Sequence, residues 1–182
     1  MRRIVLVMGG AALLAALVAA IRRALSREGA LARPLTANDS VVIERPPEEV
    51  FAYVSDLQNI PEWGALSGEM RKETEGPPEV GARYTAELTF LGRRLVIPYQ
   101  VSAYEPPRLF VFRSLGGPLH EEYTYTFEEA EGGRGGTRFS MAIEMQPDGF
   151  FRVTGPLIEK MTQRYYFRKE LKTLKGLLES RG

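Results

Sequence analysis

The chain has 182 residues, 44% of them hydrophobic and 26% charged, with a net charge of +1 and no cysteine. The lack of cysteine excludes disulfides, thiolate metal sites and a cysteine nucleophile. Residues 1–37 hold six Arg and one Glu, a net of +5, which leaves 18 basic and 22 acidic residues, a net of −4, for the rest; an acidic globular part argues against a nucleic-acid partner.

An uncharged apolar run, residues 4–21, lies near the start of the chain between two pairs of Arg. At about 1.5 Å per residue it is about 27 Å long, enough to cross the core of a bilayer. We therefore expect residues 1–25 to be a single-pass transmembrane anchor. A buried helix of a soluble protein and a cleaved secretory signal are the alternatives. A signal is disfavoured because the run exceeds the usual apolar length of about 7 to 15 residues and is followed by Arg.

The charges around the run bear on its orientation. The amino terminus, Arg2 and Arg3 precede it, and four arginines follow it: Arg22, Arg23, Arg27 and Arg33. The positive-inside rule then favours a cytoplasmic C-terminal domain, and the opposite topology stays open. Residues 26–39 contain several turn-forming residues and little apolar periodicity, so we expect a tether there and a folded domain over residues 40–182.

The domain is expected to open with a strand that leads directly into a helix. Val41–Ile43 are β-branched, which favours extended backbone. Pro46 keeps its predecessor extended, and Pro47 suits the first turn of a helix. Val50, Phe51 and Val54 then share one helical face. A second short helix is predicted next, with Asp56 as its cap and an apolar stripe at Leu57, Ile60 and Trp63.

The middle of the chain reads as strands separated by turns. Apolar residues alternate with polar ones in residues 83–90, 95–103, 122–128 and 139–145, and a shorter strand is expected at 109–114. In the second of these strands the apolar positions are Leu95, Ile97, Tyr99, Val101 and Ala103. This alternation predicts an antiparallel meander with one apolar face and one wet face.

A long helix is expected to close the chain, beginning near residues 154–156. One apolar stripe consists of Phe167, Leu171, Leu174 and Leu178, and another of Ile158, Met161 and Tyr165. We assign the first stripe to packing on the sheet and the second to the roof of a space between sheet and helix. The basic residues of this helix are read as a solvated face, or alternatively as a surface that rests on anionic lipid: Arg164, Arg168, Lys169, Lys172 and Lys175.

Several segments in this order resemble the SRPBCC superfamily, which includes START lipid-transfer domains, and most closely its bacterial polyketide cyclase/dehydrase branch. The segments are "VVIERPPEEVFAYVSDLQNIPEW" at 41–63, "VSAYEPPRLFVFRS" at 101–114, "GGTRFSM" at 135–141 and "LKTLKGLLES" at 171–180. The resemblance implies an α+β helix-grip fold, a curved antiparallel sheet wrapped around a long C-terminal helix, here with one N-terminal transmembrane helix added. Chemistry varies within one fold, so function transfers poorly.

Candidate catalytic groups are few. His120 is the only histidine and follows a turn, so we expect a solvated imidazole and no histidine-based metal site. Neighbouring glutamates such as Glu121 and Glu122 point to opposite faces of a strand and cannot share a substrate. No serine has a nearby base or a nucleophile turn. We expect no cofactor and no metal ion.

The inward strand positions are instead aromatic or soft and apolar, which suits either a packed core or a cavity for an apolar ligand. The predicted ligand-binding residues are Tyr84, Leu88, Tyr99, Tyr123, Tyr125, Phe139, Met141, Met161 and Tyr165. Arg113 is expected either to face solvent or to hold an acidic head group. We predict membrane-anchored binding or transport of a hydrophobic small molecule or lipid. A polyketide cyclase/dehydrase-like enzyme using the same cavity is the alternative, and a filled scaffold is the third reading.

Overall fold

The computed structural model describes residues 34–64, 68–90, 93–117, 120–132, 135–146 and 166–181. The expected anchor, residues 1–25, and residues 26–33 of the expected tether lie outside these ranges. Within the ranges, none of the helices has the length and apolar character needed to span a bilayer.

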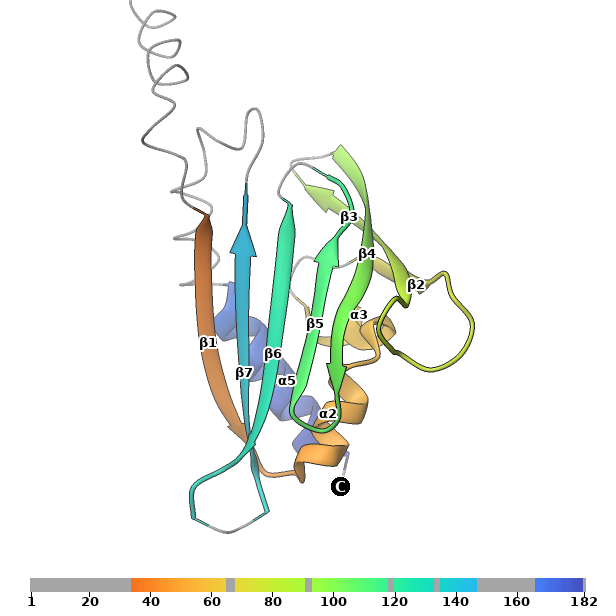
Figure 1. The fold of residues 1–182 in the computed structure, drawn as a ribbon. Helices are drawn as coiled ribbons and strands as arrows, with labels where there is room; N and C mark the ends of the chain where they lie inside the picture. The colour runs from red at the N-terminus through yellow and green to blue at the C-terminus, as the bar shows by residue number, and fades with distance from the viewer. Residues whose placement is uncertain are drawn as a thin grey trace, which may run out of the picture.

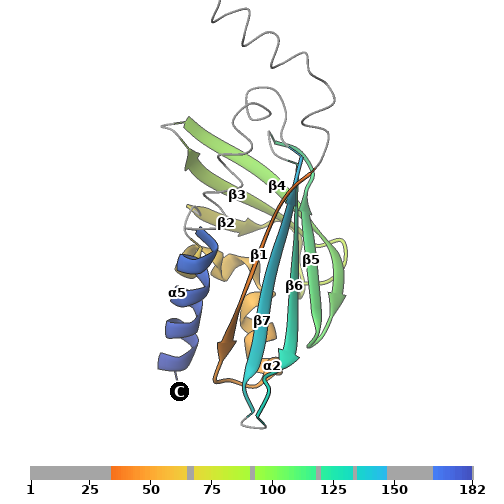
Figure 2. The same cartoon turned by 90° about the vertical axis from the view of Figure 1, so that its left-hand side faces the viewer.

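A seven-stranded antiparallel sheet curves around the helices, which lie on one side of it (Figures 1 and 2). The strands are β1 (Leu35–Ile43), β2 (Glu69–Lys72), β3 (Arg83–Phe90), β4 (Arg93–Glu105), β5 (Leu109–Ser114), β6 (Glu121–Glu129) and β7 (Thr137–Met145). Their order is β1-β7-β6-β5-β4-β3-β2. The predicted meander is confirmed, whereas β2 and the pairing of β1 with β7 were not predicted.

β1 begins at Leu35, earlier than the expected start of the domain at Ser40. Leu35 pairs with Met145 on β7, and the antiparallel register continues to Ile43. Leu35 and Ala37 are buried, so this part of the strand contributes to the core. Residues 35–39 therefore belong to the sheet and not to the tether.

The first helices lie where the sequence analysis predicts them. They are α2 (Pro47–Val54), the 3₁₀ turn η1 (Leu57–Asn59) and α3 (Ile60–Trp63). Pro47 opens α2, acidic residues occupy its first turn, and its buried side chains are Val50, Phe51 and Val54. The predicted cap is also present, because the Asp56 side chain accepts a hydrogen bond of 3.1 Å from the backbone N–H of Gln58.

The last helix, α5 (Phe167–Ser180), lies across the concave side of the sheet (Figure 2). The predicted packing stripe is confirmed, since all four members are buried: Phe167, Leu171, Leu174 and Leu178. The side chains of Arg168 and Lys172 are exposed, as expected for the basic face. Lys175 is an exception, because its Nζ donates to the Val42 carbonyl oxygen at 2.7 Å and so ties the helix to β1.

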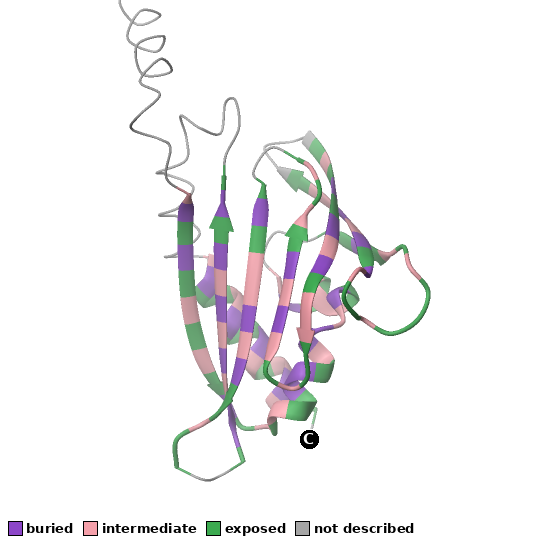
Figure 3. Ribbon diagram, viewed as in Figure 1, coloured by how far each residue is buried: buried purple, intermediate pink, exposed green. Residues whose placement is uncertain are grey.

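Buried and less buried residues alternate along the strands (Figure 3), with one correction to the predicted pattern. The register between β4 and β5 shifts between Val101 and Ala103. Beyond this irregularity Tyr104, and not Ala103, takes the inward position, with its ring 5.3 Å from that of Phe51 and 6.1 Å from that of Phe110. An extra residue in one strand reverses the faces that follow, and regular alternation does not reveal it.

Candidate functional site

The inner face of the sheet carries a continuous wall of aromatic rings. Phe112 on β5 stacks on Tyr123 of β6, with ring centroids 4.8 Å apart and an interplanar angle of 5°. Tyr99 on β4 meets both rings, at 5.7 Å from Phe112 and 6.4 Å from Tyr123. Tyr125 lies 5.4 Å from Phe112 and continues the wall along β6. Three strands thus contribute to one apolar surface that bears phenol hydroxyls.

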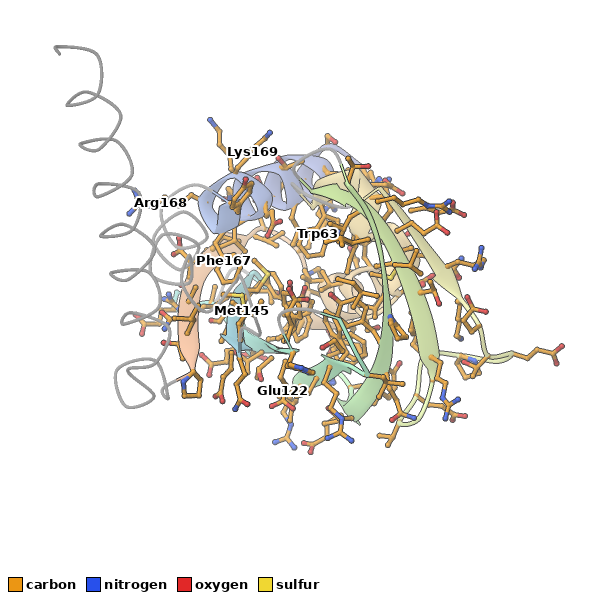
Figure 4. The ribbon with its side chains drawn as sticks, turned by 90° about the horizontal axis from the view of Figure 1, so that it is seen from above. Trp63, Glu122, Met145, Phe167, Arg168 and Lys169 are labelled. Carbon is orange, nitrogen blue, oxygen red and sulfur yellow. The ribbon has the colours of Figure 1, made fainter. Side chains whose placement is uncertain are left out.

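A buried carboxyl group stands at the end of this wall. Glu121 is only 9% exposed, and its side chain accepts a hydrogen bond from the Tyr99 hydroxyl. The backbone N–H of Glu121 donates to Ser114 Oγ at 2.8 Å, which holds the first residue of β6 against β5. The adjacent Glu122 is exposed on the outer side of the sheet (Figure 4), so the two carboxyl groups do point to opposite faces.

Burial decides the protonation of these groups. It raises the pKa of Glu121, and the hydrogen bond from Tyr99 opposes this rise in part. The pKa of Tyr99 is also raised, first by burial and then by the charge of Glu121. Burial followed by the charge of Glu121 likewise raises the pKa of Tyr123. A carboxyl group that resists ionisation therefore lies among phenols that stay protonated.

Two buried donors near this wall lack an acceptor among the described residues. The indole Nε1 of Trp63 is buried without a hydrogen-bond partner, and so is the Tyr84 hydroxyl. Trp63 lies on the concave side of the sheet (Figure 4), with its ring 6.3 Å from that of Tyr125. Buried polar groups are normally bonded, and each exception calls for an explanation such as a water or a ligand.

The structure brings most of the predicted ligand-binding residues to the inner face, with different exposure. Five are almost fully buried: Tyr84, Tyr99, Tyr125, Phe139 and Met141. Leu88 and Tyr123 are only partly buried and keep accessible surface. Met161 and Tyr165 lie outside the described residues. The ligand-binding role of all nine stays a prediction.

Two residues of the inner face, Glu121 and Trp63, were not predicted as site residues. Glu121 has the same strand parity as Tyr123 and Tyr125, and this parity was the signal that could have identified it. No comparable signal exists for Trp63, which reaches the wall only through the packing of α3. Arg113 is exposed and thus faces solvent, and His120 is exposed with a φ of 39° beside a turn.

The outer face of the sheet contains a hollow of about 380 Å³. Its lining is mostly small and polar: Asn38, Asp39, Ser40, Thr124, Thr126, Ser140, Met141 and Ala142. A lining of this type does not suit an apolar ligand. In the parts of the chain that the structure describes, no three His, Cys, Asp or Glu side chains gather to hold a metal ion.

The sequence matches the protein family described as "Polyketide cyclase / dehydrase and lipid transport" over residues 34–179. The chain belongs to this family. The match covers the whole sheet and nearly all of α5, which agrees with a domain that begins just before Leu35. No match is found among curated proteins.

Several solved structures share the fold of this protein although their sequence identity to it is low. The protein TTHA0849 from Thermus thermophilus is 16% identical with a TM-score of 0.67, and 81% of this chain covers 99% of it. A START superfamily protein from Mycobacterium smegmatis is 15% identical with a TM-score of 0.67, again with coverage of 81% and 99%. The di-domain ARO/CYC StfQ of the steffimycin biosynthetic pathway is 12% identical with a TM-score of 0.65, and 82% of this chain covers 52% of it. These likenesses confirm the helix-grip fold of the domain.

Proposed function

We propose that this protein binds a hydrophobic small molecule or lipid between the inner face of the sheet and the helices on its concave side. The observation that carries the proposal is the combination of an aromatic wall with polar tips. Tyr123 keeps accessible surface on this wall, and buried donors at Trp63 and Tyr84 lack acceptors among the described residues. A ligand with an apolar body and an oxygen would cover the rings and satisfy such a donor.

We further propose that residues 4–21 anchor this binding domain to a membrane, with the domain on the cytoplasmic side. The apolar run and its Arg flanks support this part of the proposal. The run also precedes the family match, which begins at residue 34. An anchor would keep a lipid-binding domain close to the source of its ligand.

The alternative, an enzyme similar to polyketide cyclases and dehydrases, is favoured by one observation. Glu121 and Tyr99 form a buried carboxyl–phenol pair, and groups with perturbed pKa values in concave sites are candidates for proton transfer. Arg113 and His120, the other groups considered from the sequence, are exposed. The enzyme reading predicts that Glu121→Gln abolishes loss of water from a β-polyketone, as seen by mass spectrometry, while binding of the compound persists.

The binding reading is tested first by native mass spectrometry of the full-length protein extracted in detergent. A lipid or isoprenoid that co-purifies supports it. The isolated domain, residues 34–182, is suitable for titrations, because the family match covers residues 34–179. The related solved structures also correspond to this part of the chain alone, since 81% of this chain matches 99% of each of them.

Uptake of a fluorescent fatty alcohol by this domain provides the second test. Leu88→Trp adds bulk at a partly buried inner position and should weaken uptake by about tenfold or more. Val96→Trp introduces the same side chain at a position of the adjacent strand that is 54% exposed, and should leave uptake unchanged. Met141 is less suitable because it is 1% exposed, and overpacking of a full core costs about 1–3 kcal/mol. Uptake that is unaffected by Leu88→Trp in a folded domain contradicts the proposed site.

A further inference from the structure

Two buried donors that adjoin the aromatic wall have no hydrogen-bond partner among the described residues. They are the indole Nε1 of Trp63 and the hydroxyl of Tyr84. Trp63 is 4% exposed and Tyr84 is 0% exposed, so neither residue reaches bulk water. Buried donors are nearly always bonded, and an unbonded one is costly. The two donors therefore call for an acceptor that the described part of the chain does not supply.

Trp63 brings its donor to the wall from the helix layer. This residue ends α3 and lies on the concave side of the sheet (Figure 4), with its ring 6.3 Å from that of Tyr125. Nε1 itself is buried, so the N–H lies in the interior of the domain. An indole nitrogen donates one hydrogen bond and accepts none. Only a group with a lone pair can therefore satisfy Trp63 at this place.

Tyr84 brings a second unpaired donor to the same surface from β3. It is the cross-strand partner of Tyr99 on β4, and residues directly opposite in an antiparallel pair have neighbouring side chains on one face. Burial raises the pKa of Tyr84, so its hydroxyl keeps the proton and remains a donor. The wall is thus bordered by one unpaired donor from the helices and one from the sheet.

The buried carboxyl group of the wall does not supply the acceptor that Trp63 needs. Glu121 is four residues from Tyr125 along β6, about 13 Å at about 3.3 Å per residue, whereas Trp63 lies beside Tyr125. The Glu121 side chain is also bonded to the Tyr99 hydroxyl. Burial favours the neutral form of Glu121, in which this carboxyl group and the phenol hold two protons and their bond uses one. The acceptor for Trp63 therefore has to come from outside the described residues.

We propose that the ligand carries a carbonyl-type oxygen, as in an ester, an amide or a ketone, which accepts a hydrogen bond from Trp63 Nε1 while its apolar body covers Tyr123 and Tyr125. A carbonyl oxygen has two lone pairs and no proton, so it satisfies a donor without adding one. An alcohol also accepts, but it brings a proton that needs an acceptor of its own. This inference rests on the proposed function and adds the chemical class of the ligand and the residue that recognises it.

The test compares three probes of similar size: 2-undecanone, 2-undecanol and the alkene 2-methylundec-1-ene, in which a methylene group replaces the carbonyl oxygen. Trp63 is the single Trp of the chain, so its Nε1–H gives a single indole resonance in the NMR spectrum of the ¹⁵N-labelled domain, residues 34–182. A hydrogen bond moves such a proton to lower field. The resonance should therefore lie at lower field in the ketone complex than in the alkene complex and the free domain.

A variant connects this effect to affinity. Trp63→Phe removes the donor and keeps an aromatic ring. In native mass spectrometry its affinity should fall about tenfold for 2-undecanone and about threefold or less for the alkene, because only the ketone loses a hydrogen bond. The control is Tyr53→Phe, which removes a hydroxyl from a ring that lies against the Arg181 guanidinium on another side of the helices, and should leave both affinities unchanged. If Trp63→Phe does not fold, the indole resonance of the unmodified domain decides alone.

The possible failures are distinguishable. An indole proton at the same field in the ketone and alkene complexes, or an equal loss of affinity for both probes in Trp63→Phe, overturns the role of Trp63. 2-Undecanol that binds more tightly than 2-undecanone overturns the preference for an oxygen without a proton. Either result leaves the proposed binding function intact. Failure of all three probes to bind, in NMR and in mass spectrometry, refutes the proposed function and this inference with it.

Discussion

Substitution of Leu174 by Ala tests how α5 is held on the sheet. Leu174 is 0% exposed and lies in the middle of the buried stripe. The change removes three carbon groups, worth about 2.5 kcal/mol at about 0.8 kcal/mol for each buried group. The cavity left behind raises the expected loss in the free energy of unfolding to about 3–4 kcal/mol. For a domain of this size the melting temperature should fall by about 6–16 °C.

The matched control is Lys172→Ala on the exposed side of the same helix, which should change the free energy of unfolding by no more than about 0.5 kcal/mol. Lys175 is unsuitable as a control because it bonds Val42 and Glu179. Urea unfolding of residues 34–182, followed by circular dichroism, measures both effects, and the urea dependence should stay constant. Equal losses at Leu174 and Lys172 would refute the assignment of the buried face.

Three further outcomes are expected. The folded-state pKa of Glu121 is raised, so ionisation of Glu121 lowers the stability of the unmodified domain as pH rises from the unfolded pKa of about 4.3 through the folded value. The stability of Glu121→Gln relative to the unmodified domain should therefore increase with pH over that window. A difference in melting temperature that does not depend on pH contradicts the burial of this carboxyl group. Arg113→Ala and His120→Ala should leave ligand affinity unchanged, because both side chains are exposed, and a loss above about tenfold in titrations would place them at the site. Full-length protein should sediment with membranes and resist carbonate extraction, whereas residues 34–182 should stay in the supernatant; soluble full-length protein with a new terminus near residue 33 would instead identify a cleaved signal.

The residue pattern by itself determined the faces of the regular elements. Alternation along β6 and β7 identified the buried side chains, and the spacing of Phe167, Leu171 and Leu174 identified the packing face of α5. The Pro47 opening of α2 was also readable. These features depend on the period of one strand or helix and on the chemistry of its first turn, and both are contained in a few neighbouring residues.

The tertiary structure alone decided which distant residues meet. Glu121 and Tyr99 belong to β6 and β4, which are separated by β5, so their contact depends on the register of two strand pairs. The irregularity after Val101 moved Tyr104 to the inner face. Pairing with β7 drew Leu35 into the sheet although Ala37, Asn38 and Asp39, which follow it, are weak strand formers. Strand register arises from hydrogen bonds between segments far apart in the chain, and the local pattern of one segment does not contain it.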